Sequence, residues 1–306
     1  MTNLLRAELL RIASSRIMIW IALLGVAVGS VVGMSLAELA RPVTNEDITE
    51  AQVALGDRLI AIEEDCRASA TPCDQEHIIQ EVPLEDFIRT PLAFEDLLRG
   101  TSSATGSIAL FAAVVAVTVV IGSEFTSGSL GTQLTFTPRR LPVLWAKTLT
   151  GMLTGGAIMA WWLLVGFLIN VVVFLQLRGA TDLLAGPAVA AELGRYLLLG
   201  LWGGLLAALL TMALGSALRA WVVIAAVFQI SLILDGVGGT WEWLLPTSVL
   251  EALANGYWVT YLMTATGEDA GSVALSYPAA TAYAVVVTVA FAIWACISFT
   301  RRDIRK

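Results

Sequence analysis

Six stretches of apolar residues, most of them long enough to cross a bilayer, constrain this chain more than any other feature. A helix needs about 20 apolar residues to cross a hydrocarbon core of ~30 Å. Of the 306 residues, 57% are apolar and 14% are charged, and the mean hydropathy is +0.79. A soluble fold cannot bury that much apolar surface, so lipid is expected to solvate much of it. The predicted spans are residues 17–36, 103–121, 148–175, 193–217, 221–235 and 278–299.

The charged residues are segregated along the chain, and this predicts its orientation. The net charge of −7 is an average over basic and acidic segments. Short basic loops remain in the cytoplasm, so we expect both termini there, with a cytoplasmic tail at residues 300–306 and a multi-pass protein of the cell membrane. The basic residues placed inside are Arg6, Arg11, Arg16, Arg139, Arg140, Lys147, Arg219, Arg301, Arg302, Arg305 and Lys306.

Residues 1–16 are expected to form a helix that lies along the membrane surface. Leu5, Leu9 and Ile12 recur at i, i+4 and i+7, which gives the helix an apolar face, while its arginines reach water and headgroups. An unstructured basic leader is the alternative. Residues 35–37 resemble a signal-peptide cleavage site, but the apolar run before them is long enough to span. We therefore interpret that run as the first span.

Glycines repeat at four-residue spacing in three of the predicted spans. This spacing places them on one helix face, where a neighbouring backbone can approach closely. Ordinary tolerance of glycine in membrane helices is the alternative, but three glycines in register in the first span favour packing. The predicted packing positions are Gly25, Gly29, Gly33, Gly151, Gly155, Gly200 and Gly204.

Residues 37–102 are acidic and contain no run long enough to span, so we expect an external helical insertion. A repeated motif of two acids among apolar residues followed by an arginine predicts two short helices in it, at residues 84–89 and 94–99. Asn45 is a candidate helix cap, with acidic residues in the first turn behind it. Cys66 and Cys73 are close enough in sequence to form a small disulfide loop on the oxidising side, and two free thiols are the alternative. The insertion is either an external gate or partner-binding element, or a spacer that only packs.

Residues 122–147 form a polar interruption between two spans and carry clustered basic residues. Pro138 cannot continue a helix, so it divides the segment into two short pieces. Phe125 and Leu130 keep the segment partly apolar, whereas Arg139 and Arg140 mark it as cytoplasmic. A basic, half-apolar helix–break–helix loop suits the docking of a soluble partner. A positive cytoplasmic loop without a partner is the alternative, with about equal weight.

The same segment carries a resemblance to a known family. Gly122-Ser-Glu-Phe, Gly128-Ser-Leu130, Leu134, Pro138-Arg-Arg140 and Lys147 resemble the pattern that follows the second span of ABC-2 type permeases, the membrane subunits of ATP-binding-cassette exporters. The match of residues is confined to this stretch, although the layout of spans is similar over most of the chain. The resemblance implies a coupling helix that docks into an ATPase subunit. Its expected residues are Glu124, Phe125, Gly128, Leu130, Pro138, Arg139 and Arg140.

The second half of the chain holds the remaining polar candidates. Asn170, Gln229 and Asp235 are possible pathway residues. For Asn170 we favour a bond to a neighbouring helix over contact with a substrate, and for Asp235 a place in the outer headgroup zone. Residues 236–277 contain tryptophans, glycines and a proline but no spanning run. We expect an external re-entrant or interfacial helical hairpin there, and the resemblance implies short external helices at the same place. The expected fold is therefore an all-α integral membrane protein.

The motifs of several enzyme classes are absent. No GxxxxGK[ST] motif occurs, and a single histidine, His77, excludes HExxH. The chain is therefore not expected to be an enzyme by itself or to hold a cofactor or a metal. By resemblance, ATP and Mg²⁺ bind two copies of a separate ATP-binding subunit. A second permease subunit, identical or paralogous, and the bilayer are the other expected partners, and nucleic acid is not expected.

These features predict a permease subunit of an ABC transporter. It is expected to export an amphipathic, lipid-like, drug-like or peptide substrate. The alternative is a structural or sensory subunit of a membrane complex that works through its external domain. A secondary transporter ranks third. Such proteins usually show buried ionisable residues in their spans and an internal inverted repeat, and apart from Asp235 this sequence shows neither.

Overall fold

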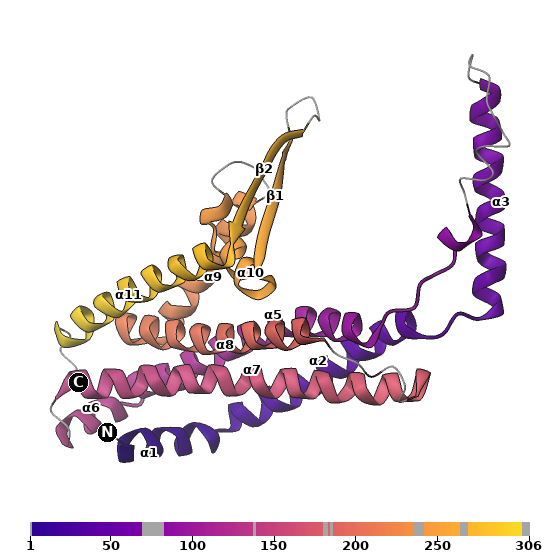
Figure 1. Cartoon of the computed structure of the whole chain (residues 1–306). Helices are drawn as coiled ribbons and strands as arrows, with labels where there is room; N and C mark the ends of the chain where they lie inside the picture. The colour runs from indigo at the N-terminus through magenta and orange to yellow at the C-terminus, as the bar shows by residue number, and fades with distance from the viewer. Residues whose placement is uncertain are drawn as a thin grey trace.

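A bundle of long apolar helices forms the body of the protein (Figure 1). The computed structural model describes residues 2–68, 83–136, 139–179, 183, 186–235, 242–263 and 269–301. Within these residues, six helices are long and apolar enough to cross a membrane, which confirms a multi-span helical membrane protein. They are α2 (Arg16–Ala40), α5 (Phe94–Thr126), α7 (Arg140–Arg178), α8 (Pro187–Leu214), α9 (Ala217–Asp235) and α11 (Tyr277–Arg301).

Helices α5, α7 and α8 form the centre of the bundle. They bury the largest shares of their apolar windows, whereas α2, α9 and α11 leave most of theirs exposed. Helices α7 and α8 share the most extensive interface. Glycines bring their backbones together, since a Cβ added to Gly155 would lie 2.3 Å from the Gly200 carbonyl oxygen. A Cβ added to Gly204 would likewise lie 2.3 Å from the Gly151 carbonyl oxygen.

The glycines of α2 face α7. A Cβ on Gly25 would meet the Trp162 ring at 2.8 Å, and one on Gly33 would meet Ile169 at 2.6 Å. Gly29 faces Val165 and Ile169 at 3.3 Å, which is a tight but less crowded contact. The face predicted for close approach in the first span is therefore the face on which α7 packs.

Helices α5 and α7 are longer than a bilayer requires. With 33 and 39 residues, they extend for about 50 and 58 Å, well beyond a core of ~30 Å. One consequence concerns residues 94–99, which were expected to form a separate short helix. They are instead the first turns of α5. A helix that is already nucleated lengthens more readily than a new one starts, because nucleation is the costly step.

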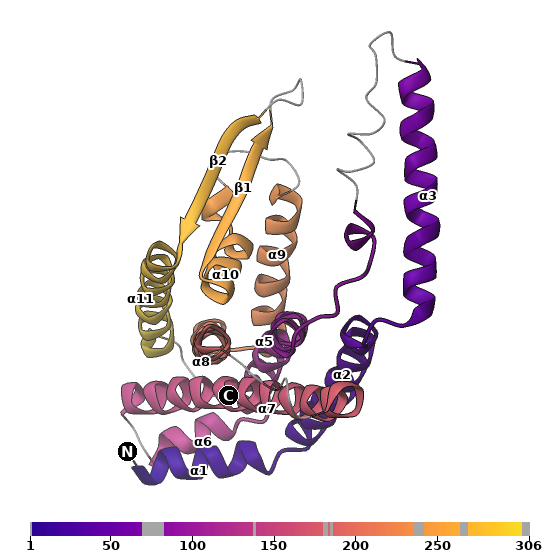
Figure 2. The ribbon, with the colours of Figure 1, turned by 45° about the vertical axis from the view of Figure 1, so that its right-hand side comes forward.

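The bundle has two ends, which we name by their neighbouring helices. At the α6 end lie α1 (Thr2–Ala13), α6 (Ser129–Phe136) and the first turns of α7, with α6 between α1 and α7 (Figures 1 and 2). At the α3 end, α2 finishes and α5 begins, and α3 (Asn45–Ala68) extends away from the bundle. Apolar residues of α2, α5, α7 and α8 pack together there: Ala40, Phe94, Leu97, Leu98, Phe174 and Val189.

Arg89 attaches the insertion to the α3 end. Its Nη1 donates to the Glu38 and Leu39 carbonyl oxygens at 3.0 and 3.1 Å, and its Nη2 donates to the Arg41 carbonyl oxygen at 3.0 Å. The last carbonyl groups of a helix have no hydrogen-bond donor within the helix, so this cation supplies donors to the carbonyl groups at the end of α2. The only regular structure between α3 and α5 among the described residues is the short helix η1 (Leu84–Asp86).

Thr44, rather than the predicted Asn45, caps α3. The Thr44 amide donates to Asp47 Oδ2 at 2.7 Å, and the Asp47 amide donates to Thr44 Oγ1 at 3.4 Å, so each residue satisfies the other. Asn45 is the first helical residue, because the Thr44 carbonyl oxygen accepts the Ile48 amide. Both residue types make good caps, and the reciprocal bond to the third helical residue selects Thr44.

This cap predicts an acid-sensitive start of α3. Bonds from the Thr44 amide and hydroxyl lower the pKa of Asp47 from 3.8 to about 2. A carboxyl whose pKa is lowered by folding stabilises the helix above its unfolded pKa, and that contribution is lost as the pH falls toward 2. We expect the protection factors of the amides at residues 45–49, which correct for the intrinsic pH dependence of exchange, to fall between pH 4 and 2. Asp47→Asn should show the lower protection already at neutral pH, and protection factors independent of pH in this window would contradict the cap.

The segment between α9 and α11 is not the expected helical hairpin throughout. The short helices η2 (Glu242–Leu244) and α10 (Pro246–Asn255) are followed by an antiparallel ribbon of β1 (Tyr257–Met263) and β2 (Asp269–Ser276). Tyr257 pairs with Ser276 and Trp258 with Leu275. The prediction of an all-helical external segment was therefore wrong for these strands, which extend away from the bundle (Figure 2).

The composition of β1 explains the ribbon. Gly256, with φ +93°, ends α10 in a conformation that side-chain-bearing residues rarely adopt. The strand Tyr-Trp-Val-Thr-Tyr that follows is aromatic and β-branched, as strands prefer. Trp258 is buried whereas Tyr257 and Val259 are exposed, so burial alternates with the period of a strand.

Candidate functional site

Four charged side chains from three helices meet at the α6 end of the bundle. Glu8 and Arg11 come from α1, Glu124 from α5 and Lys147 from α7. Lys147 Nζ lies 2.6 Å from Glu8 Oε1 and 2.5 Å from Glu124 Oε2. Arg11 Nη2 lies 2.8 Å from Glu8 Oε2 and also pairs with Glu124. Each cation therefore binds both carboxylates. We call these four residues the charge cluster.

The charge cluster is largely shielded from solvent. Glu8, Glu124 and Lys147 are 6%, 3% and 2% exposed, and only Arg11 reaches the surface with much of its side chain. Two positive and two negative formal charges balance one another. Moving an ion out of water costs several kcal/mol, on the order of 3–5 kcal/mol when a partner is missing, and the ion pairs must offset this cost. The arrangement is therefore stable only while all four groups and the three helices stay together.

Helix α6 adds a fourth element to this arrangement. Gln133 Nε2 donates to Glu8 Oε1 at 3.1 Å, so α6 is bonded to the charge cluster through α1. Leu130 is 1% exposed and packs into the core cluster of α5, α7 and α8, and Leu134 packs against the same cluster. Spacings of three and four residues place these side chains on one helix face. That face attaches α6 to the bundle.

The opposite face of α6 is open. Thr132, Thr135 and Phe136 are exposed, and Phe136 is exposed over 83% of its surface. The Phe136 ring adds an apolar contact surface to a face that is otherwise polar. We name Gly128, Thr132, Thr135, Phe136 and Arg139 the α6 outer face; all five are exposed.

The two arginines that follow α6 have different surroundings. Arg139 is exposed and precedes the first turn of α7. Arg140 is half-buried, and its Nη1 donates to the Phe299 and Thr300 carbonyl oxygens at 3.2 and 2.9 Å. Arg140 thus satisfies the end of α11. The predicted pair therefore divides into a surface cation and a cation that joins two helices, and Pro138 lies outside the described residues.

Two glycines shape the chain on either side of Glu124. Gly128 has φ +72°, which lets the chain turn between α5 and α6 without the strain that a Cβ would add. A Cβ on Gly122 would lie 2.4 Å from Ala217 Cβ, at the start of α9. The end of α5 therefore lies directly against the turn between α8 and α9.

The structure gives the predicted coupling residues different surroundings. Glu124 and Leu130 are buried, Phe125 is half-buried, and Gly128 and Arg139 are exposed. Glu124 faces the charge cluster rather than the surface. The sequence did not lead us to expect that Glu8 shares Arg11 and Lys147 with Glu124. A signal was present, because Glu8 is three residues from Leu5 and four from Ile12, on the predicted apolar face of α1.

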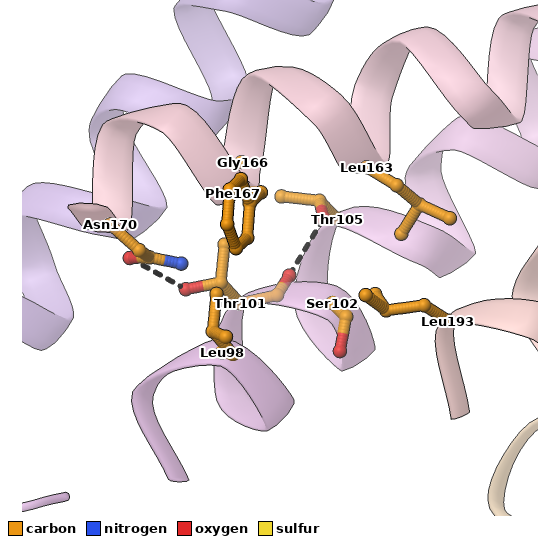
Figure 3. A pocket seen from close by; sticks show the side chains of 9 residues that line it. All are labelled: Leu98, Thr101, Ser102, Thr105, Leu163, Gly166, Phe167, Asn170 and Leu193. Atoms are coloured by element: carbon orange, nitrogen blue, oxygen red, sulfur yellow. Dashed lines mark hydrogen bonds between the residues drawn. The ribbon is translucent and has the colours of Figure 1, made fainter. Parts of the chain in front are cut away.

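Asn170 lies in the bundle near the α3 end, where it contacts α5 (Figure 3). Thr101 Oγ1 donates to Asn170 Oδ1 at 3.2 Å, whereas Asn170 Nδ2 has no hydrogen-bond partner among the described residues. A cavity of about 10 Å³ adjoins these groups, which is the size of one water molecule. Its other walls include Leu98, Thr105 and Phe167. The contact joins two helices and leaves no room for a substrate.

The remaining candidates do not converge on a site. Gln229 is exposed on α9, and Asp235 is the last residue of that helix. Cys66 lies near the end of α3, but Cys73 lies outside the described residues, as does His77. The Cys66–Cys73 bond therefore stays a prediction, which alkylation of the unreduced protein followed by peptide mass spectrometry would test.

Comparisons with known proteins add no further constraint, since the chain matches no protein-family model, no curated protein and no solved structure.

Proposed function

We propose that this chain is the permease subunit of an ATP-driven exporter of the ABC-2 class. Two permeases and two ATP-binding subunits would form the complex in the cell membrane, with both termini of this chain in the cytoplasm. The cargo would be amphipathic: lipid-like, drug-like or peptide. ATP and Mg²⁺ would bind the partner, because the sequence has no GxxxxGK[ST] motif.

The arrangement of α6 is the observation that supports this proposal most. One face of α6 is attached to the core and, through Gln133, to the charge cluster, while the other face presents Phe136 to solvent. An ATPase that pushes on the α6 outer face would move α5, α7 and α1 together. Interfaces of this kind shift between discrete arrangements rather than deform continuously.

The proposal is tested by purifying the tagged protein in mild detergent from its native host. Mass spectrometry should identify a stoichiometric partner that carries GxxxxGK[ST], and the complex should hydrolyse ATP. Repeated purification of the intact chain with no ATPase would contradict the proposal. Identical or paralogous permease subunits would be distinguished in the same spectra.

Charge reversal at the two arginines should separate docking from folding. Arg139→Glu should weaken the complex about tenfold or more, as expected for loss of a contact made by a charged group, and it should leave the melting temperature of the isolated chain unchanged. Arg140→Glu should lower that melting temperature, because it removes the two bonds to the end of α11. Binding to the ATPase by Arg139→Glu at wild-type affinity would exclude the α6 outer face around Arg139 as the docking surface.

A structural or sensory subunit is the second candidate, and the projection of α3 favours it. This helix has 24 residues and extends away from the bundle (Figure 1). Deletion of residues 45–83, bridged by a short glycine-serine linker, distinguishes the two functions, because it leaves Ala40 and the buried first turns of α5 in place. An exporter should retain its ATPase partner without the insertion, whereas a subunit that works through its external part should lose its partners.

A further inference from the structure

An open groove lies between α8 and α11, outside the charge cluster and the α6 outer face. It has a volume of about 370 Å³, and its walls come from α8, α10 and α11. Leu198, Leu199 and Leu205 line the α8 side, and Val285 and Val289 line the α11 side. Trp202 Nε1 donates to Thr288 Oγ1 at 2.8 Å across the groove, so these polar atoms satisfy each other. The surface left to an occupant is apolar.

A cation lies at one end of this groove. Arg195 belongs to the third turn of α8, near the α3 end of the bundle, and lines the groove together with Tyr277 from the first turn of α11. Its Nε donates to the Ala254 carbonyl oxygen at 2.8 Å and its Nη2 to the Asn255 carbonyl oxygen at 3.3 Å. These bonds hold the guanidinium at the end of α10.

Arg195 has charge left to offer a ligand. None of the ion pairs among the described residues includes it, whereas Arg99, on neighbouring α5, pairs with Glu95 and Glu192. Two backbone bonds also leave part of the five-donor guanidinium unused. A planar cation with free donors is well suited to a phosphate group. The groove therefore combines apolar walls with a cation at one end that suits an anion.

The dimensions fit one bilayer leaflet. The groove follows α8 from Arg195 to Leu205, which is about 15 Å at 1.5 Å per residue and thus half of a core of ~30 Å. Arg195 would lie near the headgroups while Leu205 reaches the middle of the bilayer. A phospholipid carries a phosphate at one end and an acyl chain that extends over about half of the bilayer core, so its charged and apolar parts follow the same order as those of the groove.

We propose that this groove binds one anionic bilayer phospholipid, with its phosphate on Arg195 and an acyl chain along α8 and α11. The inference depends on the membrane-spanning fold and not on the exporter assignment. The lipid would fill an apolar gap between two helices that also pack directly at the α6 end, where Leu209 and Met212 of α8 share a core cluster with Ala295 and Phe299 of α11. It would therefore hold the other end of α11 against the bundle, where this helix, with 17% of its apolar window buried, has fewer direct contacts.

The test uses the purified full-length chain, washed in detergent and supplied with phosphatidylglycerol or with phosphatidylcholine of the same acyl chains. Native mass spectrometry should detect about one phosphatidylglycerol per chain and much less phosphatidylcholine. Arg195→Gln should reduce the affinity at least about tenfold, as expected for a lost charge-assisted bond. Thr281→Trp should also reduce it, because Thr281 lines the groove and the larger ring would occupy it.

Matched variants separate this site from general lipid adhesion. Arg178→Gln removes a cation at the end of α7, and Val286→Trp adds the same ring to an exposed position of α11 that does not line the groove. Both should retain the lipid. Thr281→Trp keeps the bonds of Arg195 to α10, so it tests the site even if Arg195→Gln unfolds that helix.

Four results would overturn the proposal. The first is that both groove variants retain the lipid as the wild type does, and the second is that the two control variants lose it as much as the groove variants do. The third is that phosphatidylcholine binds as well as phosphatidylglycerol, and the fourth is that millimolar inorganic phosphate displaces the lipid. Loss of a dimer mass in Thr281→Trp with lipid retention unchanged would also overturn it, because the groove would then hold a second copy of the chain.

Discussion

Replacing Lys147 by methionine should reduce the free energy of unfolding by about 3–5 kcal/mol, the cost of breaking a buried ion pair from one side. Lys147 contacts Glu8 and Glu124 and is 2% exposed. Its loss leaves two carboxylates that share only Arg11. Glu8 is 6% and Glu124 3% exposed, so water would replace little of the lost pairing. Unfolding by SDS in mixed micelles, followed by tryptophan fluorescence, would measure the change.

Two further variants identify the cause of that loss. Lys147→Met combined with Glu124→Gln removes one charge of each sign and should recover much of the stability, because the Glu8–Arg11 pair remains. Arg139→Met, on the exposed surface nearby, should change the stability by no more than about 0.5 kcal/mol. If Lys147→Met were as stable as the wild type, the four charges could not form a shielded cluster.

The double variant also tests the role of the charge cluster in the proposed exporter. A folded protein that still binds its ATPase should lose part of the coupling between ATP hydrolysis and transport, since the ion pairs that join α1 to α5 and α7 would be gone. Normal coupling in this variant would restrict the charge cluster to a structural role.

The sequence predicted the helical membrane class because the signal for a span is long and local. A run of about 20 apolar residues is rare outside membrane-spanning helices, so most of the predicted spans lie within observed helices. The ends were less predictable. Nothing in the hydropathy of residues 94–99 shows that they continue into α5, and helix boundaries depend on tertiary contacts as well as on local preference.

The charge cluster was not predictable in full, because it joins residues more than one hundred positions apart. Glu124 and Lys147 both stand out in the sequence, but as members of a cytoplasmic surface. A charged residue near the end of a span is usually interpreted as facing water. Only the packing of α1 against α7 shows that these charges are covered, and the single local sign was Glu8 on an apolar face.

The ribbon of β1 and β2 was missed for a different reason. Its residues were assigned by the absence of a spanning run and by resemblance to a family with external helices. Alternation of burial at Tyr257, Trp258 and Val259 is a strand signal, but it covers few residues, and short apolar runs are ambiguous between helix and strand.

Gly155→Ala should destabilise the protein by about 1–3 kcal/mol, the usual cost of overfilling a packed interface. The new Cβ would lie 2.3 Å from the Gly200 carbonyl oxygen and within 3.0 Å of Gly204 backbone atoms. Backbone atoms cannot rotate away as a flexible side chain can. Helices α7 and α8 would therefore have to separate along their whole interface, and larger side chains at position 155 should cost more. The same unfolding titration would measure this loss.

The sign of the stability change distinguishes a crowded glycine from an open one. Alanine favours a helix over glycine by about 1 kcal/mol, so a glycine without neighbours should gain stability from the same change. Gly194 is such a position on α8, with nothing within 4 Å of an added Cβ. Gly194→Ala should therefore raise the stability while Gly155→Ala lowers it. If both variants were stabilised, α7 and α8 would not be in backbone contact. A Gly155→Ala, Gly204→Ala double variant should lose less than the sum of the single losses, because one separation of the helices relieves both clashes.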